Sequence, residues 1–264
     1  MKFEILTIFP EMFSPYLREG VFGRAVNSGI VDIRIINIRD FARDSHKTTD
    51  DRPYGGGDGM VMKPEPICRA LDSIEREKRS LVIFLSPQGR RFDQASAWEL
   101  SEWEQIILIC GRYEGIDERI RLHCIDREIS IGDYVLSGGE LGAMVVMDAV
   151  SRLIPGVLGG ETSNLYDSFE EGLLEYPHYT RPRIFNGTEV PDVLLSGDHE
   201  KIRIWRRTES LRKTLEKRPD LLKRANLSQE DDRILNRLKK GTWGSDAGNK
   251  ESGSENKERG CTVF

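Results

Sequence analysis

Apolar and polar residues alternate in two early segments of the chain and give way to continuous apolar runs further on. Residues 2–9 (KFEILTIF) and 30–38 (IVDIRIINI) alternate with the period of a strand. Residues 81–85 (LVIFL) and 106–110 (IILIC) are short and wholly apolar, which is typical of central parallel strands covered on both faces. Residues 128–131 (EISI) are a weaker candidate, so the pattern predicts five strands.

Segments with helical character separate these strands. They cover about residues 11–27, 64–79 and 93–101, and a fourth apolar periodicity spans 141–154. The fourth segment stops at Pro155 and Gly156, a common helix end. Strands that alternate with helices predict an α/β domain whose parallel sheet has helices on its faces.

The second part of the chain has a different character. From Val157 to about Asp198 it is rich in Gly, Pro, Ser and Asn, and a loop of that length is usually functional or a linker. Short amphipathic helices follow, and Ser228 with Asp231 resembles the capping pair of the last one. Residues 241–264 have the composition of a disordered tail. We therefore predict domains at 1–160 and 180–240, joined by a flexible linker of residues 161–179.

Charge is distributed unevenly along the chain. The formal net charge is −5, yet residues 200–240 contain fourteen Lys and Arg against seven Asp and Glu, a net of +7 that leaves −12 for the rest. A basic segment in an acidic chain fits a nucleic-acid partner, although solvated helix faces explain the charge equally well. If the partner is a nucleic acid, Arg206, Arg207 and Lys213 are expected to contact phosphates.

The features that report on location indicate the cytoplasm. No apolar run is long enough to span a bilayer, and the N-terminus lacks the pattern of a signal peptide, so we expect no membrane partner. Four cysteines, Cys68, Cys110, Cys124 and Cys261, form no CxxC pair and no common zinc spacing. This usage predicts reduced thiols in the cytoplasm, and Cys110, at the end of an apolar strand, is expected to be buried.

Three glycine-rich turns follow predicted strands: SPQGR (86–90), GRYEG (111–115) and IGDYVLSGGELG (131–142). Ligands bind beyond the carboxyl ends of strands in open α/β sheets, and glycine lets the backbone approach a ligand closely. The three turns together are therefore candidates for the walls of one cofactor pocket, although ordinary tight turns explain each of them singly. The sequence has no GxGxxG or P-loop lysine motif, which disfavours a nucleotide-dependent α/β enzyme.

A fourth loop, DDRPYGGGDGMVMKP (50–64), is too rich in glycine for a regular element. It is either a flexible surface loop or the floor of a site for a flat ligand. In the second case Tyr54 would stack on the ligand while Asp51 and Arg52 form hydrogen bonds, as proteins do with flipped nucleobases.

Several long motifs occur in order along the chain. They are RPYGGGDGMVMKPEP, LSPQGRRFDQ, LICGRYEGIDER, SIGDYVLSGGE, SRLIPGVLG, DSFEEGLLEYPHYTRP and VLLSGDHEKIRIWR, and the match they form covers roughly residues 1–240. These motifs resemble those of the bacterial tRNA (guanine-N1-)-methyltransferases, a family of knotted SPOUT-type methyltransferases. That family methylates N1 of the guanosine just 3′ of the anticodon (G37), so the resemblance implies this activity for the chain.

The resemblance also implies a fold and partners that pattern reading does not give. The family has an α/β parallel-sheet domain with a C-terminal trefoil knot, plus a small all-α C-terminal domain that binds tRNA. It works as a homodimer whose active site the two subunits share, uses S-adenosylmethionine and depends on Mg²⁺. Neither the knot nor the dimer follows from residue spacing. Because true knots are rare, an interpretation of the pattern alone would have excluded a knot.

Site residues follow by matching this chain to the family's motifs. The cofactor-binding residues that the resemblance implies are Leu85, Ser86, Pro87, Gln88, Gly89, Gly111, Arg112, Tyr113, Glu114, Gly115, Ile131, Gly132, Tyr134, Leu136, Gly138 and Gly139. The substrate-binding residues are Asp51, Arg52, Pro53, Tyr54, Gly57 and Gly59, and Glu114 is also a candidate magnesium ligand.

The chemistry of this family requires a base and benefits from a cation. Guanine N1 carries a proton at neutral pH, so its methylation needs a general base for that proton and a positive charge where negative charge develops at O6. The resemblance assigns these roles to Asp167 and Arg152. Without the motifs, Asp167 would be interpreted as a turn residue and Arg152 as a partner of the helix dipole. Structural roles are expected for the other polar residues near Asp167: Glu170, Glu171 and Glu175 solvated or paired with the basic domain, and His178 in a hydrogen bond.

Two alternatives remain open. One is a related knotted methyltransferase that acts on another tRNA or rRNA position, which would share the cofactor loops but not the DSF and GGGxGM motifs. The other is a non-enzymatic RNA-binding module, which would use the basic helices and need not bind S-adenosylmethionine.

Overall fold

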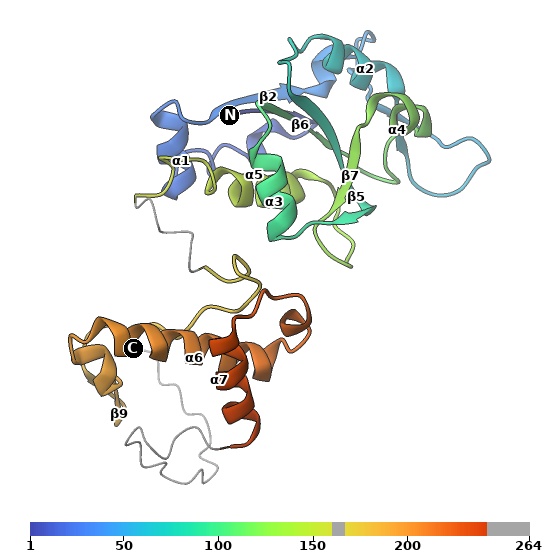
Figure 1. Ribbon diagram of the computed structural model, residues 1–264. Helices are drawn as coiled ribbons and strands as arrows, with labels where there is room; N and C mark the ends of the chain where they lie inside the picture. Colours follow the sequence, from blue (N-terminus) through green and yellow to red (C-terminus); the bar gives the residue numbers. More distant parts are fainter. Residues whose placement is uncertain (160–166, 242–264) are drawn as a thin grey trace. The chain divides into compact units, whose positions relative to one another are not determined.

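The computed structural model describes residues 1–159 and 167–241. The chain divides into two compact units, whose described residues are 1–159 and 167–241 (Figure 1). The predicted linker of residues 161–179 and the predicted tail of residues 241–264 therefore lie partly outside the described residues. Among the described residues, no helix has the length and apolar content needed to cross a membrane.

A parallel β-sheet forms the centre of the N-terminal unit. Its strands are β1 (Lys2–Thr7), β2 (Asp32–Asn37), β5 (Ser80–Arg91), β6 (Gln105–Cys110) and β7 (Arg127–Ser130), in the order β2-β1-β6-β5-β7. Every neighbouring pair is parallel. All residues of β6 are buried, as expected for a strand whose residues 106–110 are all apolar and which is covered on both faces. The structure confirms the five predicted strands and the parallel sheet.

Helices cover both faces of this sheet (Figure 1). On one face α1 (Gly20–Asn27), α3 (Gln94–Ser101) and α5 (Glu140–Ser151) share a core with Ile5. On the other face α2 (Pro64–Asp72) and α4 (Glu118–Cys124) share a core with Leu6. Successive strand residues point to opposite faces, which is why the neighbours Ile5 and Leu6 belong to different cores. The arrangement confirms the α/β class.

Three helices differ from the sequence prediction, and one of them is α2, which ends at Asp72 although the pattern predicts a helix over 64–79. The sequence does not predict α4, because its residues (ERIRLHC) are mostly polar and only Ile120 is buried. The helix expected over 11–27 is confined to Gly20–Asn27 and is preceded by a short 3-10 helix, Pro10–Met12. Gly20, the first residue of α1, has a left-handed φ of 66°, so the helix does not extend toward residue 11.

The C-terminal unit is mainly helical. Its helices α6 (His199–Lys217) and α7 (Gln229–Lys239) pack around a small apolar core of Leu173, Leu211, Ile234 and Leu235. The capping pair predicted at the start of α7 is confirmed, since the side chains of Ser228 and Asp231 each accept a hydrogen bond from the other's backbone N–H. Further 3-10 helices span Ile38–Phe41 in the N-terminal unit and Asp192–Leu195 and Leu221–Lys223 in this one.

A short hairpin modifies the expected all-α character of this unit. Strands β8 (Ile184–Phe185) and β9 (Thr188–Glu189) pair antiparallel. Their turn residues, Asn186 and Gly187, both have positive φ values, which is the conformation that favours Asn-Gly in two-residue hairpins. Periodicity misses the hairpin because each strand has two residues.

Part of the predicted flexible linker packs on the C-terminal unit. Leu173 is buried in the apolar core, and the backbone of Leu174 is hydrogen-bonded to Ser210 and Thr214 of α6. The chain around Leu173 supplies apolar surface that α6 and α7 need for their core, while the linker limits of 161–179 stay a prediction.

Candidate active site

Three loops, one inside β5 and the others after β6 and β7, line a cavity in the N-terminal unit. Its volume is about 290 Å³. The predicted cofactor residues that line it are Leu85, Ser86, Pro87, Gln88, Gly111, Arg112, Tyr113, Glu114, Gly115, Ile131, Gly132, Tyr134, Leu136, Gly138 and Gly139. Parallel strands end at the same edge of the sheet, which is why loops far apart in the sequence meet here. That this cavity holds a cofactor stays a prediction.

The first of these loops is a bulge in β5. Leu85 and Arg90 both align with Ile129 of β7, so residues 86–89 loop out between them. Gly89 returns the chain to the sheet, and a Cβ there would lie 2.4 Å from the backbone nitrogen of Ile129. Gly89 is not among the residues that line the cavity. The structure thus gives Gly89 a role in the close packing of β5 on β7.

The second and third loops are joined to each other. Gly139 N donates a hydrogen bond to Gly111 O at 3.0 Å. A Cβ on Gly139 would lie 2.8 Å from the Cα of Cys110, so the third loop runs directly against the end of β6. Because β7 lies at the edge of the sheet beside β5, the chain after β7 crosses back past β5 to reach the centre of the sheet.

A buried ion pair links these two loops to β1. Glu140, at the start of α5, is fully buried. It accepts hydrogen bonds from Arg112 Nε at 3.0 Å and from Thr7 Oγ1 at 2.8 Å. Arg112 also donates to Ser137 O on the third loop. The carboxylate of Glu140 therefore holds the second and third cavity loops to the end of β1.

Sequence reasoning missed Glu140, Thr7 and Arg121. Glu140 directly follows Gly138 and Gly139 and is the first residue of α5, a helix position where an acid is favoured, and this position was the signal that could have indicated it. Arg121 donates to Gln88 Oε1 of the first loop at 2.6 Å and to Glu128 Oε2 at 2.8 Å. No pattern indicates this contact, since α4 itself is not predicted.

The cysteines of the described residues, Cys68, Cys110 and Cys124, are free thiols. Cys110 is fully buried, as predicted. Burial and, to a smaller extent, the nearby Glu140 charge raise the pKa of the Cys110 thiol well above its ordinary value. The thiol is therefore neutral at physiological pH and packs as a small apolar group.

Tyr113, on the second loop, has a left-handed backbone with a φ of 60°. A bulky residue rarely adopts this conformation, and such strain is concentrated at functional sites. The Tyr113 side chain is half exposed and lines the cavity, so it is accessible to a ligand there.

The fourth glycine loop is a hairpin. Strands β3 (Asp50–Asp51) and β4 (Val61–Met62) pair antiparallel at its base, so the predicted substrate residues Asp51, Arg52, Pro53, Tyr54, Gly57 and Gly59 lie together on one hairpin. Tyr54 is fully exposed. The loop glycines have positive φ values, for example 112° at Gly57, which other residues rarely adopt.

This hairpin returns against the second cavity loop. Glu114 N donates to Met60 O at 3.0 Å, and a Cβ on Gly59 would lie 2.5 Å from Glu114 Oε1. The structure therefore brings a predicted substrate residue, Gly59, next to a predicted cofactor residue, Glu114. Over the described ranges 1–159 and 167–241, no group of three or more His, Cys, Asp or Glu side chains is arranged to hold a metal ion.

Arg152 lies at the C-terminal cap of α5. It lines a second cavity of the N-terminal unit, of about 210 Å³, together with Asp148 and Ser151. Asp148 accepts a hydrogen bond from Tyr16 Oη at 3.0 Å. The candidate cation thus belongs to the same unit as the cavity lined by the three loops.

Asp167 belongs to the C-terminal unit. It begins a tight turn in which Asp167 O accepts from Glu170 N at 3.3 Å and Leu173 O accepts from Phe169 N at 2.7 Å. The two predicted catalytic side chains therefore belong to different units, Arg152 to the first and Asp167 to the second.

Several arginines of α6 form ion pairs with carboxylates of the same unit. Arg203 pairs with Glu200 and Glu230, and Arg207 with Asp231 and Glu171. The expectation that Arg207 contacts phosphates is corrected, because its guanidinium is bound to two carboxylates within the unit. Arg206 instead lies over the Tyr176 ring at 5.0 Å.

Two expectations for the polar residues near Asp167 are confirmed. Glu171 pairs with the basic Arg207, and His178 is hydrogen-bonded to Glu175.

Comparison with known proteins identifies the family. The family model described as tRNA (Guanine-1)-methyltransferase TrmD matches residues 1–224. The tRNA (guanine-N(1)-)-methyltransferase of Dictyoglomus turgidum is 56% identical over 240 residues, which cover 91% of this chain and 97% of the relative. Those of Geobacter metallireducens and Carboxydothermus hydrogenoformans are 54% and 57% identical, over 91% and 89% of this chain and 99% and 92% of the relatives. The cavity is built from the motifs that suggested this resemblance, and the chain belongs to the bacterial tRNA (guanine-N1-)-methyltransferase family.

Proposed function

We propose that this chain transfers a methyl group from S-adenosylmethionine to N1 of the guanosine 3′ of the anticodon (G37) in tRNA. The observation that carries the proposal is that the three glycine-rich loops line one cavity, because all three lie within the part of the chain that matches the family.

Labelled-methyl transfer to unmodified tRNA tests this function. One tRNA carries guanosine 3′ of the anticodon and a matched tRNA carries adenosine there. We expect 1-methylguanosine from the first tRNA and no product from the second. Label at another nucleoside would favour a related methyltransferase with a different target position. Absence of both transfer and S-adenosylmethionine binding, measured by calorimetry, would favour a non-enzymatic RNA-binding module.

The chemistry of the cavity walls suits S-adenosylmethionine. Its walls combine the backbone of three loops with apolar faces of Tyr134 and Leu136, a mixture typical of small-molecule sites. A Cβ on Gly115 would meet nothing within 4 Å, so that wall is open to a ligand. The Glu114 carboxylate on the same wall suits a positively charged group. When bound, this cofactor supplies an electrophilic methyl group on a sulfonium.

The protein's own contribution is proton transfer and charge stabilisation. In the proposed mechanism the Asp167 carboxylate takes the N1 proton of guanine, which converts N1 into a nucleophile. The Arg152 guanidinium stabilises the negative charge that develops at O6. The proposal requires these two groups to meet the same guanine, within one chain or across a dimer.

Replacing Arg152 with glutamine is expected to lower kcat about 10²- to 10³-fold, with little change in the KM for S-adenosylmethionine, because the cation acts on charge that develops in the transition state. Steady-state kinetics at saturating tRNA measures both constants. Arg76→Gln, at an exposed arginine after α2, is the matched control. Equal kcat values for the two variants would contradict the role of Arg152.

We also propose that the basic helices α6 and α7 bind tRNA through phosphate contacts. Lys213→Gln is expected to weaken tRNA binding and to reduce the slope of log K against log salt by about 1, as the loss of one phosphate contact does. Filter binding over a salt series measures the slope. Arg203→Gln should change the slope less, because Arg203 already pairs with Glu200 and Glu230. A larger effect of Arg203→Gln would refute the proposed contact.

The trefoil knot and the dimer are proposed from the family, with support from local features. The crossing of the chain from β7 past β5, and the contact of Gly139 with Cys110, support a knotted C-terminal part of the N-terminal unit. Leu141 and Val145 lie on one face of α5 and are 52% and 46% exposed, and exposed apolar faces are typical of interfaces. We propose a homodimer in which both subunits contribute to each active site.

Three remaining parts of the proposal concern domains, metal and location. The proposed domain limits are 1–160 and 180–240, with the packed segment around Leu173 added to the second domain.

Magnesium usually keeps several waters and uses one or two carboxylates with substrate oxygens. Glu114 therefore supplies at most one ligand, and the described residues do not by themselves make a magnesium site. The free thiols of the described residues support a cytoplasmic location.

A further inference from the structure

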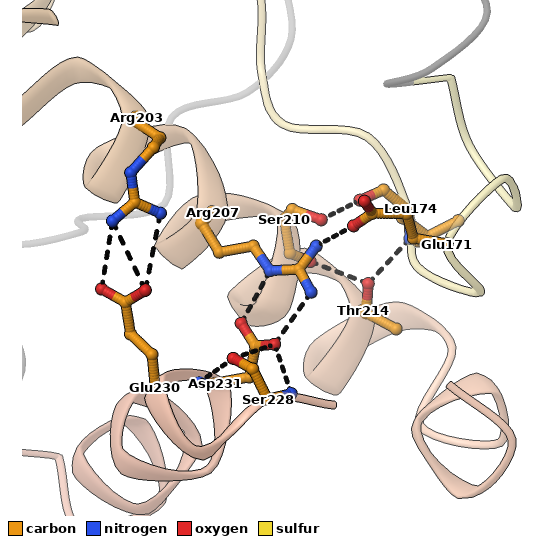
Figure 2. Close-up of polar contacts among 9 residues, drawn as sticks. All are labelled: Glu171, Leu174, Arg203, Arg207, Ser210, Thr214, Ser228, Glu230 and Asp231. Carbon is orange, nitrogen blue, oxygen red and sulfur yellow. Dashed lines mark hydrogen bonds and ion pairs between the residues drawn. The ribbon is translucent and has the colours of Figure 1, made fainter. Parts of the chain in front are cut away.

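The turn that carries Asp167 is attached to α6 at three points (Figure 2). Thr214 Oγ1 accepts a hydrogen bond from Leu174 N at 2.8 Å, and Ser210 Oγ donates one to Leu174 O at 2.5 Å. The third attachment is the ion pair between Glu171 and Arg207. Both backbone polar groups of Leu174 and one charged side chain of the turn are thus bound to a single helix.

Arg207 is itself held in a fixed orientation (Figure 2). Its Nε and Nη2 atoms donate to the two carboxylate oxygens of Asp231, at 2.7 and 2.9 Å. Burial raises the pKa of Asp231, but hydrogen bonds from Arg207 and Ser228 outweigh burial and lower the pKa to about 2. Asp231 therefore stays charged at neutral pH. A planar bidentate pair of this kind fixes the guanidinium and leaves Nη1 for Glu171.

Packing and backbone strain confirm that the turn is firmly held. Leu173 is 4% exposed in the core of the unit, and a Cβ on Gly172 would lie 3.1 Å from the Cα of Ala225. Phe169 has a left-handed φ of 79°, although its ring is 43% exposed, so burial of the ring does not explain the strain. Such strain persists only where the surroundings fix the backbone, and it is concentrated at functional sites.

We propose that Glu171, Ser210 and Thr214 are positioning residues that fix the base, Asp167, to the helical unit that binds tRNA. The inference rests on the proposed function, in which Asp167 takes the N1 proton. A base must lie within hydrogen-bond reach of that proton, and a displacement of about 1 Å costs on the order of 100-fold in rate. Docking of tRNA on α6 and α7 then sets the position of the base, which couples substrate binding to proton removal.

The first test compares Thr214→Val with Thr214→Ser. Valine has nearly the shape of threonine but removes the acceptor for Leu174 N, whereas serine keeps it. Thr214→Val is expected to lower kcat about 10- to 100-fold at neutral pH, with unchanged KM values for tRNA and S-adenosylmethionine, and Thr214→Ser is expected to restore kcat. The defect should shrink as the pH approaches the pKa of guanosine N1, because the substrate then loses its proton without a base.

The second test avoids the buried core, since Thr214 is fully buried. Glu171 is 59% exposed, so Glu171→Gln removes one attachment without disturbing packing, and it should lower kcat several-fold. The matched control is Glu230→Gln, which breaks an ion pair between Arg203 and α7 but leaves the Asp167 turn untouched (Figure 2). Glu230→Gln should keep wild-type kcat.

Equal kcat values for Glu171→Gln and Glu230→Gln would overturn the inference, whether or not Thr214→Val folds. A Thr214→Val defect confined to KM, or constant at every pH, would overturn it as well. Asp167→Asn is measured beside these variants. If Asp167→Asn is inactive while the positioning variants match the wild type, only this inference fails. If Asp167→Asn keeps full turnover, the base assignment fails and the positioning inference fails with it.

Discussion

Replacing Asp167 with asparagine is expected to lower kcat for methyl transfer roughly 10²- to 10⁴-fold, the usual contribution of a general base. Asparagine has almost the same size, and the backbone bond from Glu170 N to Asp167 O does not involve the side chain. The turn should therefore keep its structure, while the group that accepts the N1 proton is lost. Single-turnover kinetics at saturating tRNA and S-adenosylmethionine isolates this step from binding.

The pH dependence of the variant separates a base from a structural residue. Without a base, the rate should rise with pH in proportion to the fraction of guanosine that has already lost its N1 proton. The wild-type rate should exceed the rate of Asp167→Asn most at neutral pH, and the two rates should converge at alkaline pH. Asp192→Asn, at an exposed acid of the same unit that pairs with Arg183, should behave as the wild type. Near-wild-type turnover of Asp167→Asn at neutral pH would refute the assignment.

The sequence predicts the sheet and the cavity loops because both have local signals. The run Ile106–Cys110 is wholly apolar and becomes the fully buried β6. The glycines at 111, 138 and 139 lie where neighbouring atoms leave no room for a Cβ: one on Gly138 would lie 2.2 Å from the side-chain Nε of Arg112, and one on Gly139 would lie 2.8 Å from the Cα of Cys110. Runs of apolar residues and clusters of glycines can be recognised in a single sequence. The pattern therefore predicts the parallel sheet and the glycine-rich loops that follow its apolar strands.

The contacts that hold the candidate site together lack a local signal. Thr7 and Glu140 are 133 positions apart, and Arg207 and Glu171 are 36 apart. A count of charges gives the net of +7 over residues 200–240, but it does not show which arginines are already paired. For this reason Arg207 is predicted as a phosphate contact and found in an internal network, while Glu140 is missed altogether. Pairing between distant residues depends on the fold, and one sequence does not record it.

Replacing Arg112 with methionine is expected to destabilise the N-terminal unit by about 3–5 kcal/mol, the usual cost of leaving a buried charge without its partner. Glu140 is fully buried and would keep only the hydrogen bond from Thr7. The free energy of unfolding, from denaturant titration followed by a probe in the N-terminal unit, measures the loss. Since Arg112 and Glu140 join two loops of the cavity, S-adenosylmethionine binding should weaken as well. Arg112→Met with Glu140→Met should recover part of the stability, because no buried charge then remains.

Arg34→Met is the matched control, because Arg34, on β2, also pairs with a fully buried glutamate, Glu4 of β1. Arg34 Nε lies 3.7 Å from Glu4 Oε2, but the Arg34 side chain is 49% exposed, and Lys2 lies 3.4 Å from the other oxygen of Glu4. Its replacement should therefore cost about 1 kcal/mol or less, as for exposed ion pairs. If Arg112→Met costs no more than Arg34→Met, the Glu140 ion pair does not hold the cavity loops. The loops would then depend on backbone contacts alone, chiefly the bond from Gly139 N to Gly111 O.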